Sequence, residues 1–338
     1  MKNINYESPE TVQALVEKYF PTLYKTTKNT QIELLNVSEN YTFLVTMGKT
    51  RHILRVHRPF YHTPEELKAE TFFMHSLKKD TELTIPKIVA GSDGGLIQHF
   101  PSEREPITYY CSVSTYLEGT LAEDMHLEGN ELFKKMVSIG KITAQLHNYV
   151  VSHEMKLERP EWNFESMFGD NATWGDWRAC KILQPEHIAL FERVLEIARQ
   201  KLEAFGRGFD RFGLIHGDLR FASIIVRGKQ LQIINFDDCG YSWFLYDLAC
   251  TVVQFSEDLN ELITAWLTGY QGIRSLSPEE LAAVPTFVLI RRILRFAWFA
   301  SHGDARKLRT LDMAGYLVKT MELAEKYCKE NGEVHENA

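Results

Sequence analysis

A hairpin-like segment between residues 212 and 250 constrains the possible fold more than any other part of this 338-residue chain. Two short apolar runs, at residues 224–226 and 231–234, flank a turn that contains Gly228. Apolar runs around a glycine-containing turn are typical of a β-hairpin. The hairpin would bring together the polar residues just outside both runs, which include His216, Asp218, Ser223, Asn235, Asp237 and Asp238. Such an arrangement suits the binding of a metal ion and of reacting groups.

The order and spacing of these residues resemble the catalytic segment of the aminoglycoside phosphotransferase and choline kinase family, small-molecule relatives of the protein kinases. In that family a His-Gly-Asp-x-x-x-x-Asn motif supplies a catalytic Asp and a metal-binding Asn. An Ile-Asp-Phe motif after the hairpin supplies the Asp that binds magnesium. This chain matches with His216-Gly217-Asp218-Leu219 and, further on, with Gly240 and Asp247-Leu248-Ala249. The resemblance implies that Asp218 is the catalytic residue that takes the proton of the acceptor hydroxyl.

Two positions depart from the family pattern, and both are metal ligands in the family. Ser223 stands where the family has Asn, and Asn235 stands where it has the magnesium-binding Asp. Magnesium usually takes one or two carboxylates together with phosphates and water. The amide of Asn235 removes a formal charge, and the hydroxyl of Ser223 has a shorter reach than an amide. We therefore expect weak magnesium binding at a site that includes Ser223, Asn235 and Asp237.

Asp237 is the candidate replacement for the missing carboxylate, because it lies two residues beyond Asn235. If the strand continues through Phe236, the two side chains point to the same face of the sheet. Two residues of strand span about 6.6 to 6.8 Å, which is large against a magnesium–oxygen distance of roughly 2.1 Å. A faithful replacement would need a bend in the chain or an intervening water molecule.

The residues before the hairpin predict a small lobe built on an antiparallel sheet. Residues 9–19 place apolar side chains at helical spacing behind Ser8, which is a predicted helix cap. A second helix is expected after Pro64. We expect a five-stranded sheet from strand-like patterns at residues 32–35, 41–47, 50–57 and 108–119 and from residues 85–100, whose pattern indicates a strand, a glycine turn and another strand.

Four residues, three in this lobe and Glu118 just beyond its expected end, are assigned nucleotide contacts by their order in the chain. Ser38 and Asn40 lie in a connection that is similar to the family loop over the nucleotide phosphates, although this connection contains no glycine. Backbone groups near Tyr116 and Glu118 correspond to the family hinge that faces adenine. The resemblance therefore implies ATP binding by these two segments.

Arg55 and Glu70 are the expected ion pair of the nucleotide site. Arg55 lies on a strand that resembles the family strand whose basic residue contacts the α and β phosphates. A guanidinium can bind phosphate or carboxylate through two parallel hydrogen bonds. Glu70, on the following helix, is the candidate acidic partner. The simpler alternative is a surface arginine and a solvated glutamate.

The remainder of the chain predicts a larger, mainly helical lobe, so that the domains are expected at residues 1–117 and 118–338. Asn130 is the predicted cap of the first of its helices, and His147, near the end of that helix, is interpreted as structural. Helical periodicity is present at residues 130–150, 186–205, 243–255, 259–270, 278–298 and 308–327.

Two clusters in this lobe have alternative interpretations. The aromatic segment from Trp162 to Trp177 would form a wall beside the acceptor or, equally well, a loop that packs onto the lobe. The second cluster is Arg291, Arg292 and Arg295, on one predicted helix. A solvated or ion-paired face is favoured over substrate binding for these arginines.

Composition excludes several function classes. A net charge of −7 and a pI near 6.0 argue against a nucleic-acid-binding surface. Residues 1–10 are polar, unlike a signal peptide, and no apolar run reaches membrane-spanning length. We expect a cytoplasmic protein with no membrane partner. The five scattered cysteines lack the spacing of a zinc site and are expected to be reduced.

Together these patterns predict a bilobal α+β fold of the protein-kinase type, with a small antiparallel β lobe and a larger, mainly helical lobe. The resemblance implies an ATP-dependent phosphotransferase that acts on a hydroxyl group of a small molecule, with ATP and weakly bound Mg²⁺. The alternative is a pseudokinase, a nucleotide- or metabolite-binding regulatory module with little transfer activity, and Ser223 and Asn235 motivate it. The fold does not name the acceptor. Aminoglycoside, homoserine-like, sugar and protein acceptors all fit it.

Overall fold

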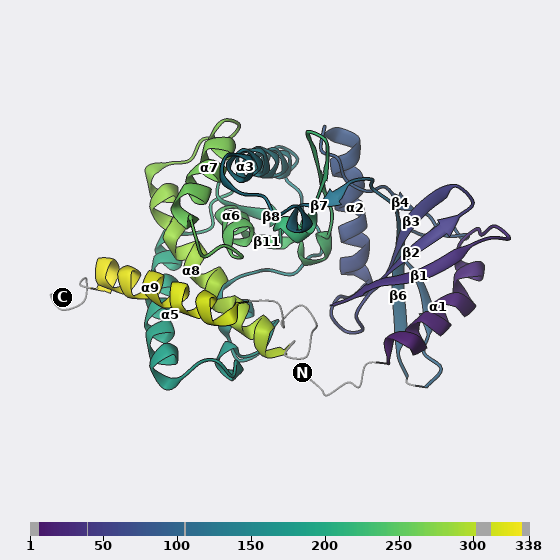
Figure 1. Ribbon diagram of the computed structural model, residues 1–338, viewed down its shortest axis with the longest axis horizontal. Coiled ribbons are helices and arrows are strands. Elements are labelled where there is room, and N and C mark those ends of the chain that lie inside the picture. Colours follow the sequence, from purple (N-terminus) through teal and green to yellow (C-terminus); the bar gives the residue numbers. More distant parts are fainter. Residues whose placement is uncertain (1–6, 39, 105, 302–311, 333–338) are drawn as a thin grey trace. The chain divides into compact units, whose positions relative to one another are not determined.

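The computed structural model describes residues 7–38, 40–104, 106–301 and 312–332, which fold into two compact units of mixed α and β structure (Figure 1). The first unit contains the chain up to Thr120 together with Lys156–Arg159 and Ile225–Asp237. The second contains Leu121–Met155, Pro160–Ile224 and the chain from Asp238 onward. The sequence analysis expected a single boundary after residue 117. The structure differs, because two later segments of the chain also belong to the first unit.

Hydrogen bonds explain why the later segment Ile225–Asp237 belongs to the first unit. The Gln232 side chain donates a hydrogen bond to the Glu118 carbonyl over 2.8 Å. The Ile233 N–H donates to the Thr84 carbonyl over 2.9 Å. Sequence periodicity carries no information on such long-range contacts, which is why a single boundary was expected.

The first unit is organised around an antiparallel sheet of six strands rather than the expected five. The order is β1-β2-β3-β6-β4, and β5 also pairs with β6. The segment expected at residues 85–100 forms two short strands, and both pair with the long β6. The bounds are β1 (Gln31–Val37), β2 (Tyr41–Met47), β3 (Thr50–Val56), β4 (Ile88–Val89), β5 (Gln98–Pro101) and β6 (Thr108–Thr115).

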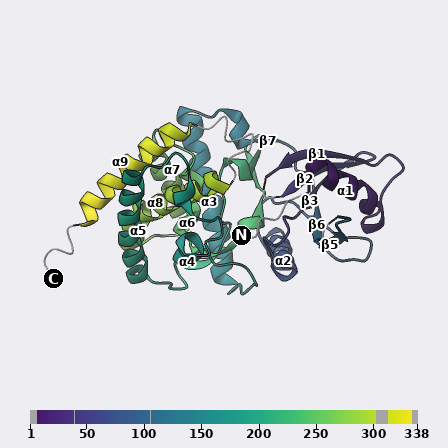
Figure 2. The same cartoon turned by 90° about the horizontal axis from the view of Figure 1, so that it is seen from below.

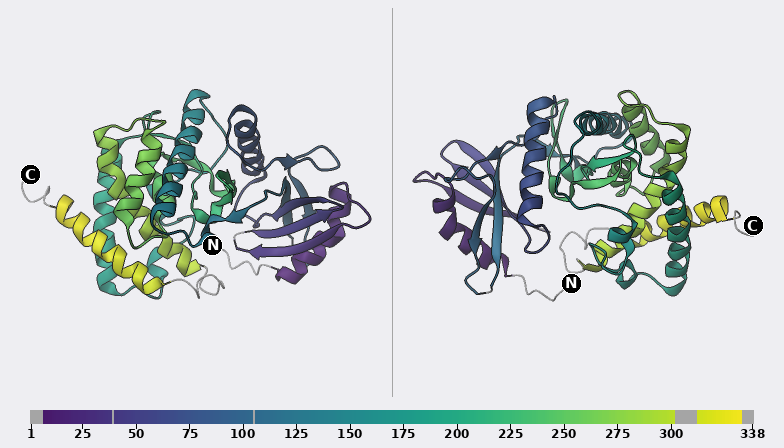
Figure 3. Two further views of the ribbon diagram at one scale, coloured as in Figure 1. Left: turned by 45° about the horizontal axis from the view of Figure 1, so that its top comes forward. Right: turned by 180° about the vertical axis from the view of Figure 1, so that it is seen from behind.

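Two helices belong to this unit. In α1 (Pro9–Leu23) the Ser8 hydroxyl accepts a hydrogen bond from the Thr11 N–H, which confirms the predicted cap. Apolar residues of α1 join those of β2 and β3 in one core, and Figures 2 and 3 show α1 (purple) running along the sheet. The second helix, α2 (Pro64–Asp80), begins with a capping box formed by Thr63 and Glu66 and packs against β4.

The predicted hairpin is confirmed as β9 (Ile224–Arg227) and β10 (Gln230–Ile233), with β7 (Thr120–Leu121) beside β9. Gly228 has a φ of +60°, a backbone conformation that glycine adopts without strain and that the tight turn requires. The β10 strand ends at Ile233, two residues before Asn235. The strand therefore does not continue through Phe236, and the condition for Asn235 and Asp237 to share one face of a strand is not met.

The second unit is mainly helical, as expected, and contains a two-stranded sheet of β8 (Phe212–Ile215) and β11 (Gly240–Trp243). The predicted cap Asn130 is wrong, because the first helix begins one residue earlier and Glu128 holds the cap position. The expected helix at 308–327 begins at Met313, and residues 302–311 lie outside the described part. The helices are α3 (Gly129–Ser152), α4 (Phe164–Phe168), α5 (Pro185–Phe205), α6 (Leu245–Val252), α7 (Leu259–Gln271), α8 (Pro278–Ser301) and α9 (Met313–Asn331).

Close helix packing positions the interior of this unit. The α3 and α7 helices approach so closely that a Cβ on Gly269 would lie 1.9 Å from the Val137 carbonyl oxygen. A Cβ on Gly140 would likewise lie 2.0 Å from the Trp266 carbonyl oxygen. Glycine at both positions permits this crossing. The α9 helix (yellow) packs against α5 (teal) (Figure 3). Among the described helices, none combines the length and apolar content needed to cross a membrane.

Candidate active site

The His-Gly-Asp loop follows β8, and the carboxylate of Asp247 on α6 fixes its backbone. The Oδ2 atom of this fully buried carboxylate accepts a hydrogen bond from the His216 N–H over 3.1 Å. Its Oδ1 atom accepts from the Gly217 N–H over 2.8 Å. Gly217 has a φ of +80°, and a Cβ there would lie 2.3 Å from the Asp238 carbonyl oxygen. Gly217 and Asp247, which both match the family pattern, therefore hold Asp218 in a defined position.

The buried His147 supports the same carboxylate. Its Nε2 atom lies 3.1 Å from Asp247 Oδ2, and its Nδ1 atom lies 2.9 Å from the Tyr270 hydroxyl. Burial lowers the pKa of His147, and the Asp247 charge opposes this only in part. His147 is thus a fully packed structural residue, which confirms the sequence interpretation.

Two arginines hold the carboxylate of Asp218. Its Oδ2 atom accepts a hydrogen bond from Arg220 Nε over 2.7 Å, and its Oδ1 atom accepts from Arg291 Nη2 over 2.8 Å. Charge-assisted hydrogen bonds of this length fix the orientation of a carboxylate strongly. The Asp218 side chain remains 12% exposed, so part of it is accessible from outside the unit.

Two arginines of the α8 cluster are buried, and the third, Arg295, is half-buried. Arg291 is 3% exposed and ion-pairs with Asp218, so the ion-paired interpretation is confirmed for this residue. Arg292 is fully buried and donates to the Phe255 carbonyl and the Thr320 hydroxyl. Arg295 donates to the Val253 carbonyl over 3.2 Å. The sequence analysis did not place Arg291 beside Asp218, although an arginine within an apolar helical run is a signal of such a buried pair.

Ser223, a predicted metal ligand, is fully buried in the short turn before β9. Its hydroxyl donates a hydrogen bond to the Asp218 carbonyl over 2.8 Å. This contact ties the loop of Asp218 to the start of the hairpin.

In the first unit, Arg55 on β3 bridges two acidic side chains. Arg55 Nη1 lies 3.2 Å from Glu70 Oε1 and 3.2 Å from Asp237 Oδ1. Glu70 is only 4% exposed, so the alternative of a solvated glutamate is wrong. The expected pairing of Arg55 with Glu70 is present. Arg55 Nη2 also donates to the side-chain oxygen of Asn235 over 3.4 Å.

The chain bends between Asn235 and Asp237, as a replacement of the family carboxylate would require. Asn235 has a φ of +62°, a left-handed conformation that Asn tolerates better than most residues. A single turn of 3₁₀ helix, Phe236–Asp238, follows. Burial raises the pKa of Asp237, but the Arg55 charge and smaller contributions bring it below the ordinary carboxyl value. Asp237 is therefore ionised at neutral pH.

The donor set at this bend fits a magnesium ion that brings further ligands with it. Across the described ranges, no group of three or more His, Cys, Asp or Glu side chains gathers as a self-sufficient metal site would need. Asp237 offers an ionised carboxylate, and Asn235 offers an amide oxygen beside it. Magnesium commonly binds through one or two carboxylates and completes its shell with phosphates and water. Ser223, the third predicted ligand, belongs to the second unit.

Arg159 is a residue of this cluster that the sequence analysis missed. Its buried guanidinium donates to the Glu66 carbonyl over 2.9 Å and to the Asp237 carbonyl. Its Nη1 atom lies 3.9 Å from Glu70 Oε2. Arg159 thus connects α2 to the bend that carries Asp237, and no local sequence pattern marks it.

The predicted phosphate loop is connected to the same cluster through Asn40. The Asn40 side chain is buried, accepts a hydrogen bond from the Arg58 N–H over 3.0 Å and donates to Asp237 Oδ2 over 3.3 Å. Ser38 is exposed, and its N–H donates to the Asn40 carbonyl over 3.1 Å. Residue 39 lies outside the described residues. Of the two predicted residues, Asn40 therefore reaches the cluster through its side chain.

The predicted adenine-facing segment makes contacts within the first unit. The Tyr116 N–H donates to the Arg51 carbonyl over 3.2 Å, and the Arg51 guanidinium lies 4.2 Å from the centre of the Tyr116 ring. The Glu118 carboxylate pairs with Arg51, and the Glu118 carbonyl accepts from Gln232. One lone pair of that carbonyl stays available for a further donor.

The aromatic segment of the second unit packs onto the unit for the most part. Trp162 is 3% exposed and donates to the Asp238 carbonyl over 2.8 Å, and Trp177 is 1% exposed. Trp174 is half-buried, and the Arg291 guanidinium lies 4.7 Å from the centre of its ring. The packing alternative is thus correct for Trp162 and Trp177, whereas Trp174 lies beside the Asp218 cluster.

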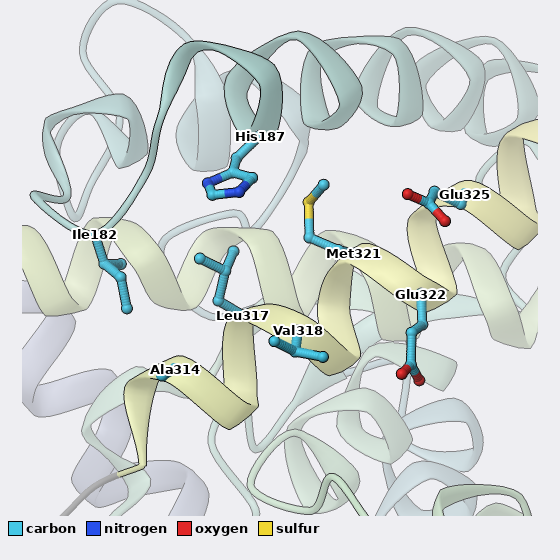
Figure 4. A pocket seen from close by; sticks show the side chains of 8 residues that line it. All are labelled: Ile182, His187, Ala314, Leu317, Val318, Met321, Glu322 and Glu325. Atoms are coloured by element: carbon cyan, nitrogen blue, oxygen red, sulfur yellow. The ribbon is translucent and has the colours of Figure 1, made fainter.

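A separate hollow of about 400 Å³ lies between the start of α5 and α9 (Figure 4). It is lined by His187, by apolar residues such as Leu317 and Met321, and by Glu322 and Glu325. None of the predicted site residues lines it. The hollow is therefore distinct from the cluster around Asp218.

Comparisons with known proteins agree with this geometry. The chain matches the phosphotransferase enzyme family over residues 31–282. The structure of the microcompartment-associated aminopropanol kinase is 31% identical, has a TM-score of 0.83 and covers 95% of this chain and 98% of its own. Amicoumacin kinase hAmiN, solved with AMP-PNP, Ca²⁺ and Ami, is 20% identical with a TM-score of 0.74, covering 94% of this chain and 96% of its own. Amicoumacin kinase of Bacillus subtilis (strain 168) is 20% identical over 278 residues, 78% of each chain. The expected kinase-like fold is confirmed.

Proposed function

Because the chain belongs to the phosphotransferase enzyme family, we propose that it transfers the γ-phosphate of ATP to a hydroxyl group of a small molecule. The observation that carries this proposal is the position of Asp218. Its backbone is fixed through Asp247, its carboxylate is held by two arginines, and part of its side chain stays accessible. Phosphoryl transfer asks the protein chiefly for such positioning and for charge neutralisation.

The proposed reaction assigns one role to Asp218. The acceptor hydroxyl oxygen forms a bond to the γ-phosphorus while the bond from that phosphorus to the β–γ bridging oxygen breaks. ADP leaves with the electron pair of the broken bond, and the hydroxyl proton passes to the Asp218 carboxylate. A divalent cation held through Asp237 and Asn235 would neutralise charge on the phosphates.

The first unit supports the nucleotide part of the proposal. The Arg55 guanidinium is held between Glu70 and Asp237, which orients a cation for the α and β phosphates. We assign the phosphate loop to Ser38 and Asn40 and the adenine contacts to the backbone near Tyr116 and Glu118. These nucleotide contacts do not involve the acceptor, so the protein would bind ATP whichever acceptor it uses.

A second candidate function is that of a pseudokinase, a nucleotide- or metabolite-binding module with little transfer activity. The hydroxyl of Ser223 is already used to brace the Asp218 carbonyl, and Asn235 carries no charge. The proposed metal site of the first unit would therefore offer a single carboxylate, that of Asp237, beside Arg55. Weak magnesium binding would slow transfer without preventing nucleotide binding.

A thermal-shift titration with ATP, with and without Mg²⁺, followed by an ADP-release screen over small hydroxyl compounds, tests both functions. The Asp218→Asn variant should keep its ATP-induced shift and lose transfer by about a hundredfold or more. Asp210→Asn, at an exposed position of the same unit, is the matched control and should retain the parental rate. An ATP-induced shift without turnover of any acceptor would favour the pseudokinase, and equal rates for Asp218→Asn and the parent would remove Asp218 from the reaction.

A further inference from the structure

Arg220 is the more exposed of the two arginines that hold Asp218, at 35% against 4% for Arg291. Arg220 Nε donates to Asp218 Oδ2, and the Arg220 side chain is 35% exposed. Within the described part of the chain, its two terminal nitrogens donate no hydrogen bond. Arg220 therefore presents unused donors beside the Asp218 carboxylate.

Arg220 is not needed to neutralise Asp218, because Arg291 already does so from the buried side. Arg291 Nη2 donates to Asp218 Oδ1 over 2.8 Å, and Arg291 Nε and Nη1 are buried without a hydrogen-bond partner among the described residues. One carboxylate thus faces two guanidinium groups. If Arg220 turned away toward a ligand, Arg291 would still hold Asp218 in place.

Other charges near this cluster do not remove its cationic character. Burial lowers the pKa of Arg295, Tyr316 opposes this shift, and the Arg220 and Arg291 charges contribute to it. The acidic groups that act on the cluster besides Asp218 are Asp238 and Glu123. Glu123 is exposed, so solvent screens its charge. The ammonium group of an acceptor would meet like charges beside Asp218.

An oxyanion has the opposite preference. The planar guanidinium presents its terminal N–H groups as a fork that matches two oxygens of a carboxylate or phosphate. We propose that the phosphate acceptor carries a carboxylate or phosphate beside its reactive hydroxyl and that Arg220 binds this oxyanion. The proposal rests on the proposed function and narrows its acceptor to an anionic hydroxy compound. It also gives Arg220 a role that the metal and nucleotide residues do not share.

Acceptors that share one hydroxyl and differ in charge test the proposal. 3-Hydroxybutyrate, 1-amino-2-propanol and 1,2-propanediol each carry a secondary hydroxyl next to a methyl group and are anionic, cationic and neutral. Glycerol 3-phosphate and glycerol form a second pair, which separates phosphate recognition from carboxylate recognition. ADP release gives kcat/KM for each compound with the parent, Arg220→Met, Arg220→Lys and the exposed control Arg199→Met.

We expect the parent to have a higher kcat/KM for one anionic acceptor than for the neutral partner of that acceptor. Arg220→Met should lower the ratio of these two kcat/KM values about tenfold or more, mainly by raising KM for the anionic acceptor. Arg220→Lys should restore part of the ratio because it restores the charge, and Arg199→Met should leave the ratio at the parental value. A preference of the parent for 1-amino-2-propanol, or a ratio that Arg220→Met does not change, would overturn the proposal.

Calorimetric titration of 3-hydroxybutyrate and of glycerol 3-phosphate, with ATP present, separates failure of this inference from failure of the proposed function. If no acceptor is phosphorylated, binding of either probe to the parent but not to Arg220→Met still supports the oxyanion site and refutes only the transfer activity. If neither probe shows Arg220-dependent binding, the oxyanion site is refuted whether or not transfer occurs. Circular dichroism of Arg220→Met and Arg220→Lys verifies that both variants are folded.

Discussion

Replacement of Arg55 by Met should destabilise the first unit even without nucleotide. The guanidinium lies 3.2 Å from carboxylate oxygens of both Glu70 and Asp237, and all three side chains are largely buried. Loss of one partner from a buried ion pair typically costs about 3–5 kcal/mol. Arg55→Met removes two ion pairs at once, but Arg159 still lies near Glu70 and Asn40 still donates to Asp237. We therefore expect the free energy of unfolding to fall by an amount within that range rather than by twice as much. Met retains most of the aliphatic bulk of Arg55. The loss in free energy of unfolding therefore reports mainly the removal of the charge.

The pH dependence of this loss has a definite sign. In the parent, burial raises the pKa of Asp237, and the Arg55 charge with smaller contributions brings it below the ordinary carboxyl value. In Arg55→Met burial prevails, so the folded variant binds a proton at Asp237 more readily than the unfolded chain does. The stability of the variant then rises as pH falls toward the carboxyl range. The difference in free energy of unfolding between parent and variant should therefore be larger at pH 7 than at pH 5.

Arg51→Met is the matched control, because Arg51 lies on the same strand and pairs with Glu118 at side-chain exposures of 41% and 54%. An exposed pair of this kind contributes about 0–1 kcal/mol. All six tryptophans lie in the second unit, so their fluorescence does not report on the first. Urea denaturation followed by circular dichroism, with amide hydrogen exchange of β2 and β3, provides the readout. Equal losses for Arg55→Met and Arg51→Met, or a difference that does not change with pH, would refute the reasoning.

Three further predictions follow from the metal site, the helix crossing and the buried histidines. Ser223→Asn combined with Asn235→Asp should tighten magnesium-dependent ATP binding and Asp237→Asn should weaken it, as measured by calorimetry; no change in either variant would exclude these residues as ligands. Gly269→Ala should lower the free energy of unfolding by about 1–3 kcal/mol or more, because its Cβ would lie 1.9 Å from a carbonyl oxygen, whereas Gly272→Ala, with its nearest atom 3.3 Å away, should have little effect. Burial lowers the pKa of His57 and of His147, so the unfolded chain takes up protons below about pH 6.5 that the folded chain does not, and each histidine should cost up to about 1.4 kcal/mol of stability per pH unit there. A denaturation midpoint that stays constant between pH 7 and pH 5 would contradict this last prediction.

The local parts of the fold and site could be predicted from the sequence. The hairpin around Gly228 depends on two apolar runs and a turn, and all three are visible in the chain. The pairing of Arg55 with Glu70 was expected from the resemblance of this strand and the next helix to those of the family, and the residues are 15 positions apart. The hairpin depends on a short stretch of chain whose pattern is visible locally, whereas the ion pair depended on the resemblance.

The arginines around Asp218 and Asp237 could not be predicted in the same way. Arg291 contacts Asp218 across 73 positions, and Arg159 contacts Asp237 across 78. A charged residue on a helix is usually solvated, and only the packing of α8 against other elements on nearly all sides reveals that Arg291 is buried. The bend at Asn235 was one of two options left open, for a related reason. An apolar run shows where a strand can form but does not show at which residue the chain leaves it.

The first unit is built from three separate stretches of chain, which has a consequence for how the protein is made. A ribosome adds Asp237 more than a hundred residues after Thr120, yet Asp237 belongs to the same unit. During that interval Arg55 and Glu70 lack the partners that complete their charge cluster. The nascent small unit must therefore wait for more than a hundred further residues before it reaches its final structure. A fragment that stops at Thr120 would stay in the condition of that unfinished intermediate.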